Sequence, residues 1–322
     1  MAQRTRLGRY ELLETIGQGE ILTVYRARDT KRDRPVVLKV IQPHLLDDAD
    51  LVDRFRREAE KLMCLRHPHI ASVCDVNTSA ETPYLVMEAP SGESLEQRLA
   101  ERGPLEIDDV LSFVSQVAGA LDYAHDQGVF HRDLRPANIY LDGQTAVLTN
   151  FYVLEAAEST PIYMAPEQLD GTDTTAVDRR SESYALGVVV YEMLTGRPPF
   201  EGAVADVAAA HLTLRPTPPR AHNPELLPAL DIILLKTLAK QPHSRYQTAG
   251  DLAIALREAV QIAQTRRMAH DGIFDIKPVT MKETAHTPSF LKRESGVPTW
   301  VWVGLGILLI VVLSAIILLA TG

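Results

Sequence analysis

The spacing of apolar and polar residues divides most of the chain into a strand-rich part followed by a helix-rich part. Residues 9–90 carry short apolar runs of the length typical of strands, together with one amphipathic helix predicted at 51–65. Further along, apolar residues recur at helical spacing, most clearly at 108–127 and 178–194, which predicts helices there. The pattern therefore indicates an α+β fold whose sheet and helices come from different parts of the chain.

The periodic pattern ends near Ala263, and two segments of different character follow. Residues 264–298 are polar and aperiodic, which predicts a flexible linker. Residues 299–320 are almost wholly apolar and are long enough to cross a bilayer as one helix. A buried helix is the alternative, but helices in a protein core are seldom so uniformly apolar. Because Lys292 and Arg293 precede the span, we expect a single-pass protein of the cell membrane with a cytoplasmic body.

Charge and cysteine content narrow the classes of function. The net charge of the chain is −9, so it lacks the basic character expected of a nucleic-acid-binding protein. Its two cysteines, Cys64 and Cys74, do not have the spacing of a metal site. We interpret them as small apolar residues of a protein in a reducing compartment.

One stretch, residues 130–152, is predicted to form a loop, two short strands joined by a tight Asp-Gly turn, and a second loop. It resembles the catalytic centre of protein kinases, where an HRDLKPxN loop precedes an Asp-Phe-Gly motif. The resemblance implies that Asp133 is the catalytic base and that Asn138 is a metal ligand. It also places Arg135 where the family has a lysine near the γ-phosphate, and Asn150 where it has a metal-binding aspartate.

Segments before this stretch resemble the rest of a kinase nucleotide site, in the same order. Residues 17–25 are similar to the glycine-rich loop, with Leu22 at its third glycine position. Lys39 matches the lysine that grips the α- and β-phosphates, and Glu58 matches its glutamate partner. Glu60 is the competing candidate, but Glu58 has the better register on the inward face of its helix. The resemblance implies nucleotide contacts at Gly17, Gly19, Val24, Val37, Lys39, Met87, Glu88 and Tyr140.

Several departures from the family pattern converge on the same predicted site. Asn150 offers a neutral oxygen where an anion would hold Mg²⁺, and a hard dication binds such an oxygen less well. Tyr152 replaces the flexible glycine of the Asp-Phe-Gly motif. Unless the alignment slips by one residue, Pro90 stands at the hinge position whose backbone N–H meets adenine in the family, and proline has no N–H. Val37 and Tyr140 alter the residues expected above and below the adenine, so we expect ATP and Mg²⁺ to bind weakly.

Later segments complete the resemblance, which covers residues 9–263. Glu167 and Arg245 match a pair of residues that braces the helical lobe in this family. The chain is identified as a member of the membrane-anchored, eukaryotic-like (Hanks-type) Ser/Thr protein kinases of bacteria. The family implies a bilobal fold with an N-lobe at 9–90 and a C-lobe at 91–263, here followed by one C-terminal transmembrane helix.

The implied function depends on how far the altered residues disable the site. We predict a pseudokinase: a signalling or scaffold protein that works through protein partners and binds ATP and Mg²⁺ weakly. The alternative is an active Ser/Thr protein kinase that transfers the γ-phosphate of ATP to protein substrates with atypical metal use. This alternative is favoured by the retention of four family residues: Lys39, Glu58, Asp133 and Asn138.

Overall fold

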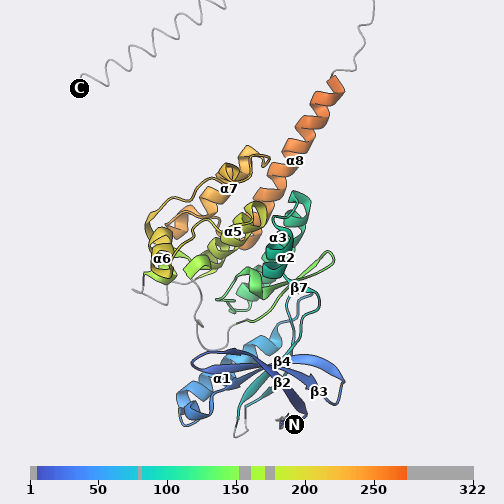
Figure 1. Ribbon diagram of the computed structural model, residues 1–322, viewed down its shortest axis with the longest axis vertical. Coiled ribbons are helices and arrows are strands. Elements are labelled where there is room, and N and C mark those ends of the chain that lie inside the picture. Colours follow the sequence, from blue (N-terminus) through green and yellow to red (C-terminus); the bar gives the residue numbers. More distant parts are fainter. Residues whose placement is uncertain (1–5, 79–81, 152–160, 171–177, 274–322) are drawn as a thin grey trace, which may run out of the picture. The chain divides into compact units, whose positions relative to one another are not determined.

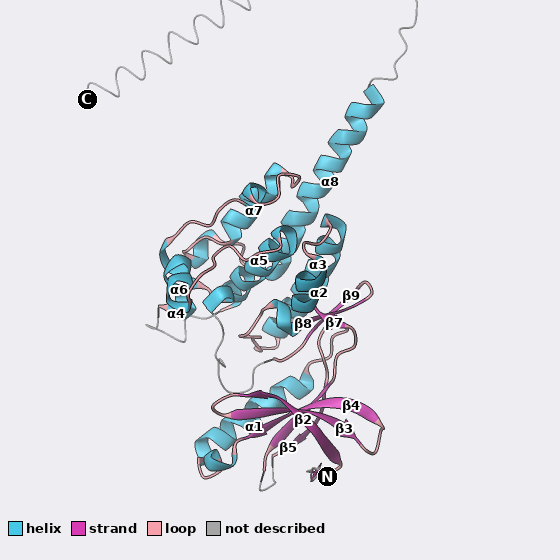
Figure 2. Cartoon of the chain, viewed as in Figure 1, coloured by secondary structure: helices cyan, strands magenta, loops and turns pink. Residues whose placement is uncertain are grey.

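The computed structural model describes residues 6–78, 82–151, 161–170 and 178–273 (Figure 1). Within them the chain forms a strand-rich N-lobe and a helical C-lobe, as the distribution of apolar residues predicts (Figure 2). The predicted α+β, bilobal architecture is therefore confirmed. The predicted span at 299–320 lies outside these ranges, and no helix within them is long and apolar enough to cross a membrane.

The N-lobe is built on one antiparallel sheet of six strands in the order β1-β2-β3-β4-β6-β5. Its helix, α1 (Ala49–Cys64), agrees with the predicted amphipathic helix and buries Phe55, Ala59 and Leu62 on one face. The side chain of Asp48 accepts a hydrogen bond from a backbone N–H of the first turn and caps this helix. The strands are β1 (Arg6–Leu7), β2 (Tyr10–Gln18), β3 (Leu22–Asp29), β4 (Arg34–Ile41), β5 (Val73–Asn77) and β6 (Tyr84–Glu88).

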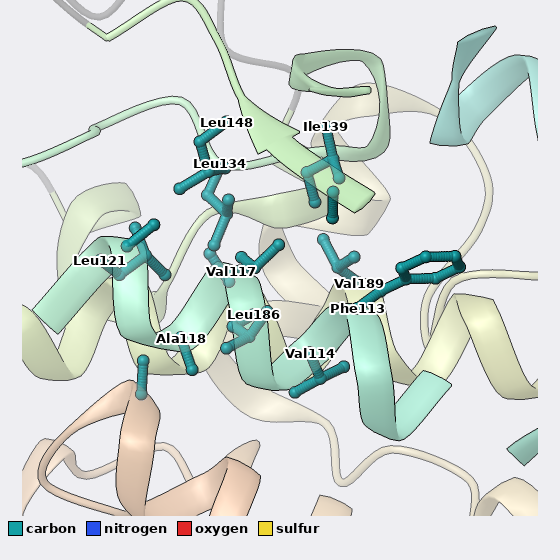
Figure 3. Packing of buried hydrophobic residues seen from close by; sticks show 14 of the residues in the cluster. Phe113, Val114, Val117, Ala118, Leu121, Leu134, Ile139, Leu148, Leu186 and Val189 are labelled. Carbon is teal, nitrogen blue, oxygen red and sulfur yellow. The ribbon is translucent and has the colours of Figure 1, made fainter. Parts of the chain in front are cut away.

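Two central helices, α3 (Ile107–Asp126) and α5 (Arg179–Thr195), form the centre of the C-lobe and match the helices predicted at 108–127 and 178–194. Apolar side chains of α3, α5 and the strands beside them pack into one core (Figure 3). Because α5 is buried on nearly all sides, its polar side chains need partners inside the protein. The other helices are α2 (Leu95–Arg102), α4 (Pro166–Leu169), α6 (Val204–Thr213), α7 (Pro228–Thr237) and α8 (Ala249–Ile273).

A small sheet of β7 (Glu93–Ser94), β8 (Ile139–Asp142) and β9 (Thr145–Leu148) positions the predicted catalytic stretch. The predicted Asp-Gly turn joins β8 to β9, with Gly143 at φ 58°. Gly92 precedes β7 and has φ 81°. A side chain at this position would collide with the carbonyl oxygen of Leu141, so the close approach of β7 to β8 requires glycine here.

A partly buried ion pair joins the start of α4 to the segment before α8. The guanidinium of Arg245 donates two hydrogen bonds to the carboxylate of Glu167, at 2.7 and 2.8 Å, which confirms the predicted pairing. The hydroxyl of Ser181 donates a third, at 2.6 Å. Burial acts to raise the pKa of Glu167, but the hydrogen bonds from Arg245 and Ser181 outweigh it and lower the pKa overall.

The last described helix, α8, continues past the point at which the sequence predicts a linker. The prediction of a linker from residue 264 is therefore wrong for 264–273, and its remaining part, 274–298, lies outside the described residues. Ile262 is 52% exposed and Met268 is 74% exposed, so the end of the helix does not bury an apolar face. The apolar period disappears because packing ends, while Ala, Gln and Arg continue to favour a helical backbone.

Candidate active site

Hydrogen bonds join the two C-lobe loops that carry the predicted catalytic residues. The backbone N–H of Thr149 donates to the carbonyl of Asn138 at 2.9 Å, and its hydroxyl donates to the same oxygen at 3.2 Å. The Nε2 atom of His131 lies 2.8 Å from the carbonyl oxygen of Thr149. The rings of His131 and Phe151 are both buried, with centroids 4.6 Å apart. The loop that begins at His131 is therefore held against the loop that follows β9.

The buried carboxylate of Glu182, on α5, fixes the first of these loops. It accepts a hydrogen bond from the backbone N–H of Arg132 at 2.7 Å and lies 2.7 Å from Nε2 of His125, on α3. Burial acts to raise the pKa of Glu182, but the hydrogen bonds and the charge of His125 lower it overall, so the carboxylate is ionised. Arg132 has φ 65°, a conformation that costs ~1–3 kcal/mol for a residue with a side chain. The hydrogen bond from Arg132 to Glu182 stabilises this turn.

Asp133, Asn138 and Asn150 lie in a row that is linked by side-chain amides, and we call these three residues the amide row. The Nδ2 atom of Asn150 donates to Oδ1 of Asn138 at 3.3 Å. The Nδ2 atom of Asn138 donates in turn to Oδ2 of Asp133 at 2.9 Å. Asn150 has φ 61°, which asparagine tolerates better than most residues with a side chain. The structure therefore brings together the predicted base and both predicted metal positions.

The charge of the amide row comes from one residue. Asp133 carries its carboxylate, and Nε of Arg135 lies 3.4 Å from Oδ2 of that carboxylate. Asn138 and Asn150 are neutral. Among the described residues, no group of three or more His, Cys, Asp or Glu side chains is arranged to hold a metal ion.

A pocket of about 300 Å³ opens beside the amide row and is lined by residues of both lobes. Ten predicted site residues line it: Gly17, Val24, Val37, Lys39, Met87, Glu88, Arg135, Asn138, Tyr140 and Asn150. Gly19 does not line it, and its backbone N–H donates to the carbonyl of Leu22 at 2.9 Å. Gly19 therefore shapes the turn of the glycine-rich loop.

The pocket is also lined by four residues that the sequence did not indicate: Ile16, Ala71, Ala137 and Thr149. Ile16, Ala137 and Thr149 each lie next to a predicted motif, so their neighbours could have indicated them. Ala71 has no such signal. A hydrogen bond from its backbone N–H to the carbonyl of Leu148 (2.8 Å) brings it to the site from a distant segment.

The strands β4 and β6 form the end of the pocket at which the family binds adenine. Val37 and Met87 lie directly opposite each other across these strands. The carboxylate of Glu88 pairs with Arg34 at 2.8 Å, and the backbone N–H of Glu88 donates to a carbonyl outside the pocket wall. Pro90 lines the pocket and has no N–H to offer a ligand. Pro90 and Val37 therefore both lie at the pocket wall.

Lys39 lies at the pocket wall but does not make the predicted ion pair. It is only 3% exposed, and its ammonium donates to the carbonyl oxygen of Phe151 at 3.0 Å. Burial lowers the pKa of Lys39 from 10.5 to about 8, and the negative charge of Asp133 partly opposes this shift. Among the described residues, Glu58 pairs with Lys61 at 2.8 Å and not with Lys39. The predicted Lys39–Glu58 pair is therefore wrong for this structure. Glu58 instead pairs with Lys61, which lies three residues further along the same helix.

Comparison with known proteins identifies the family. Residues 10–253 match the protein kinase domain. The chain is 35% identical over 265 residues to the serine/threonine-protein kinase PrkC of Bacillus subtilis, a match that covers 78% of this chain and 40% of PrkC. It is 39% identical over 264 residues to the serine/threonine-protein kinase PknB of Mycobacterium tuberculosis, a match that covers 76% of this chain and 42% of PknB. The chain thus spans less than half the length of these curated relatives.

Solved structures agree with this assignment. The crystal structure of a single-residue mutant of the Mycobacterium tuberculosis PknI kinase domain is similar with a TM-score of 0.64 and 31% identity, over 81% of this chain and 99% of that chain. A crystal structure of Rad53 in complex with AMP-PNP is similar with a TM-score of 0.65 and 25% identity, over 76% of this chain and 64% of that chain. The chain therefore belongs to the protein kinase family and contains a bacterial Hanks-type Ser/Thr kinase domain.

The lowered pKa of Lys39 predicts a pH-dependent effect on stability. Between about pH 8 and pH 10.5 the unfolded chain binds more protons at Lys39 than the folded chain, so the wild type gains stability as the pH rises through this window. Lys39→Met removes the buried cation. The free energy of unfolding of Lys39→Met relative to wild type should therefore fall by ~1 kcal/mol between pH 7 and pH 9.

Urea unfolding of both proteins at each pH measures this difference. Lys61→Met is the matched control, because Lys61 is exposed on α1, and its difference from wild type should change little over the same range. A constant difference for Lys39→Met would contradict the burial-lowered pKa of Lys39.

Proposed function

We propose that this chain is a kinase-derived signalling protein that binds adenine nucleotide weakly, transfers phosphate slowly or not at all, and acts through protein partners. The observation that carries the proposal is the hydrogen bond from Nδ2 of Asn150 to Oδ1 of Asn138. It engages the oxygen atom through which Asn138 would bind a metal. It also ends the amide row in a neutral amide, where the family has an anion.

The residues of the pocket fit an adenine nucleotide. The pocket has a volume of about 300 Å³, which is at the lower end of the range of small-molecule sites. Apolar residues of β4 and β6, together with Tyr140, line one end, and the cations of Lys39 and Arg135 line the wall near the amide row. Pro90 removes a backbone donor from the adenine end, which supports weak rather than tight binding.

The same residues do not fit Mg²⁺ well. Magnesium prefers a near-octahedral set of oxygen ligands that includes carboxylates, and Asn138 and Asn150 supply neutral amides. The carboxylate of Asp133 already accepts a hydrogen bond from Asn138 and lies beside Arg135. Phosphoryl transfer depends on neutralising the charge that develops on the phosphate oxygens. The proposal therefore contains no transfer step through a metal held by these residues.

An active protein kinase is the second candidate, and one arrangement favours it. Lys39 lies at the pocket wall and Asp133 lies within the amide row beside it, as transfer to a hydroxyl group would require. The curated relatives are named serine/threonine-protein kinases, which makes a Ser or Thr hydroxyl the natural acceptor. In this candidate Asp133 would accept the proton of that hydroxyl.

A transfer assay on the full-length chain separates the two candidates. The chain is incubated with labelled ATP, a generic Ser/Thr substrate protein, and either Mg²⁺ or Mn²⁺. The proposal predicts that wild type transfers no more label than Asp133→Asn, because the loss of ~4 kcal/mol of transition-state stabilisation slows transfer about a thousandfold. A kinase of known activity, assayed in parallel, shows that the conditions support transfer.

Label that depends on Asp133 and forms at a rate comparable with that of the reference kinase would overturn the proposal and establish the active-kinase candidate. Label that is equal in wild type and Asp133→Asn would come from a contaminant, and a repeat with more highly purified protein should remove it.

Membrane attachment is a separate part of the proposal and rests on the apolar sequence at 299–320 and the basic residues before it. We expect the full-length chain to sediment with membranes and to be released by detergent but not by high salt. A chain that lacks 299–320 should remain in the supernatant. Sedimentation of the shortened chain with membranes, resistant to high salt, would contradict this anchor.

A further inference from the structure

The two ends of the pocket differ in charge. At the adenine end the carboxylate of Glu88 is neutralised by Arg34, at 2.8 Å. At the other end the wall includes the cations of Lys39 and Arg135, together with the two neutral amides of the amide row. Asp133, the anion of that row, lies 3.4 Å from Nε of Arg135 and offsets part of its charge, but it does not line the pocket. The charged side chains that line this end are therefore both cations, where the phosphates of a bound nucleotide would lie.

Asn150 removes a repulsion at the same place. A carboxylate at position 150 would face the phosphates across the pocket wall, and a bridging cation would be needed to hold the two anions together. The amide of Asn150 carries no charge. One of its two N–H groups donates to Asn138, and the other can donate to a phosphate oxygen.

We infer that this site takes a nucleoside triphosphate in its metal-free, fully charged form, and that Mg²⁺ weakens the binding. Magnesium bound to the triphosphate cancels two of its negative charges and so weakens its attraction to Lys39 and Arg135. The amide row supplies no anion at Asn138 or Asn150 to recover that loss by coordinating the metal. This inference rests on the proposed nucleotide site and goes further by naming the ionic form of the ligand.

Isothermal titration calorimetry on the full-length chain in detergent tests the inference, with ATP as the probe. One titration contains EDTA and the other contains excess Mg²⁺. The dissociation constant in EDTA should be lower than in Mg²⁺ by about tenfold. Adenosine, which has no phosphates, should bind equally in the two solutions, because only the phosphates carry the charge that Mg²⁺ cancels.

Two variants that each add one negative charge sharpen the test. Asn150→Asp should reverse the effect, so that ATP binds more weakly in EDTA and Mg²⁺ tightens the binding. Gln261→Glu is the matched control, because Gln261 is exposed on α8 and is not part of the pocket wall, and it should behave as wild type. If Asn150→Asp does not fold, the comparison of EDTA with Mg²⁺ on wild type decides the inference alone.

The outcomes separate this inference from the proposed function. Tighter binding of ATP in Mg²⁺, or equal binding in the two solutions, overturns the inference and leaves the nucleotide site in place. Absence of ATP binding in both solutions overturns the inference and the proposed nucleotide site together. Tighter binding in EDTA, lost in Asn150→Asp and kept in Gln261→Glu, supports the inference.

Discussion

The position of the site depends on one buried carboxylate, that of Glu182. It lies on α5, the most buried helix, and holds both His125 of α3 and the backbone N–H of Arg132. A buried charge without such partners would cost several kcal/mol, so the carboxylate and its two donors require one another. Arg132 is thereby kept in a left-handed turn, and Asp133 follows it directly into the amide row.

The amide row shows how a kinase fold can keep its shape while its charge changes. Asparagine and aspartate have nearly the same size, and both tolerate the positive φ found at Asn150. Either residue is therefore compatible with the backbone path beside Phe151, whose ring packs against His131. The two residues differ in the charge that they bring to the pocket wall. Family membership and fold are in this way independent of the chemistry that the site performs.

Motifs and apolar spacing predicted the parts of the structure that depend on local sequence. The helices α1, α3 and α5 follow from their periodic burial, and the Glu167–Arg245 pair follows from two short motifs. The Glu58–Lys61 pair is a local i,i+3 contact, but the family resemblance favoured Lys39 as the partner of Glu58. Two features depended on packing or on distant contacts and could not be predicted from local sequence: α8 continues beyond its last packed turn, and Ala71 reaches the pocket through a hydrogen bond to Leu148. The hydrogen bond between Asn150 and Asn138 is of the same kind, since it joins loops on either side of a hairpin.

The central claim is that the two asparagines hydrogen-bond to each other and do not hold a metal. A crystal structure of the protein grown with ATP and Mn²⁺, with anomalous data recorded for manganese, tests it directly. The account predicts no anomalous peak within ~2.5 Å of Oδ1 of Asn138, and an Asn150–Asn138 hydrogen bond like that described above. A manganese ion bound to the side-chain oxygens of both Asn138 and Asn150 would contradict it.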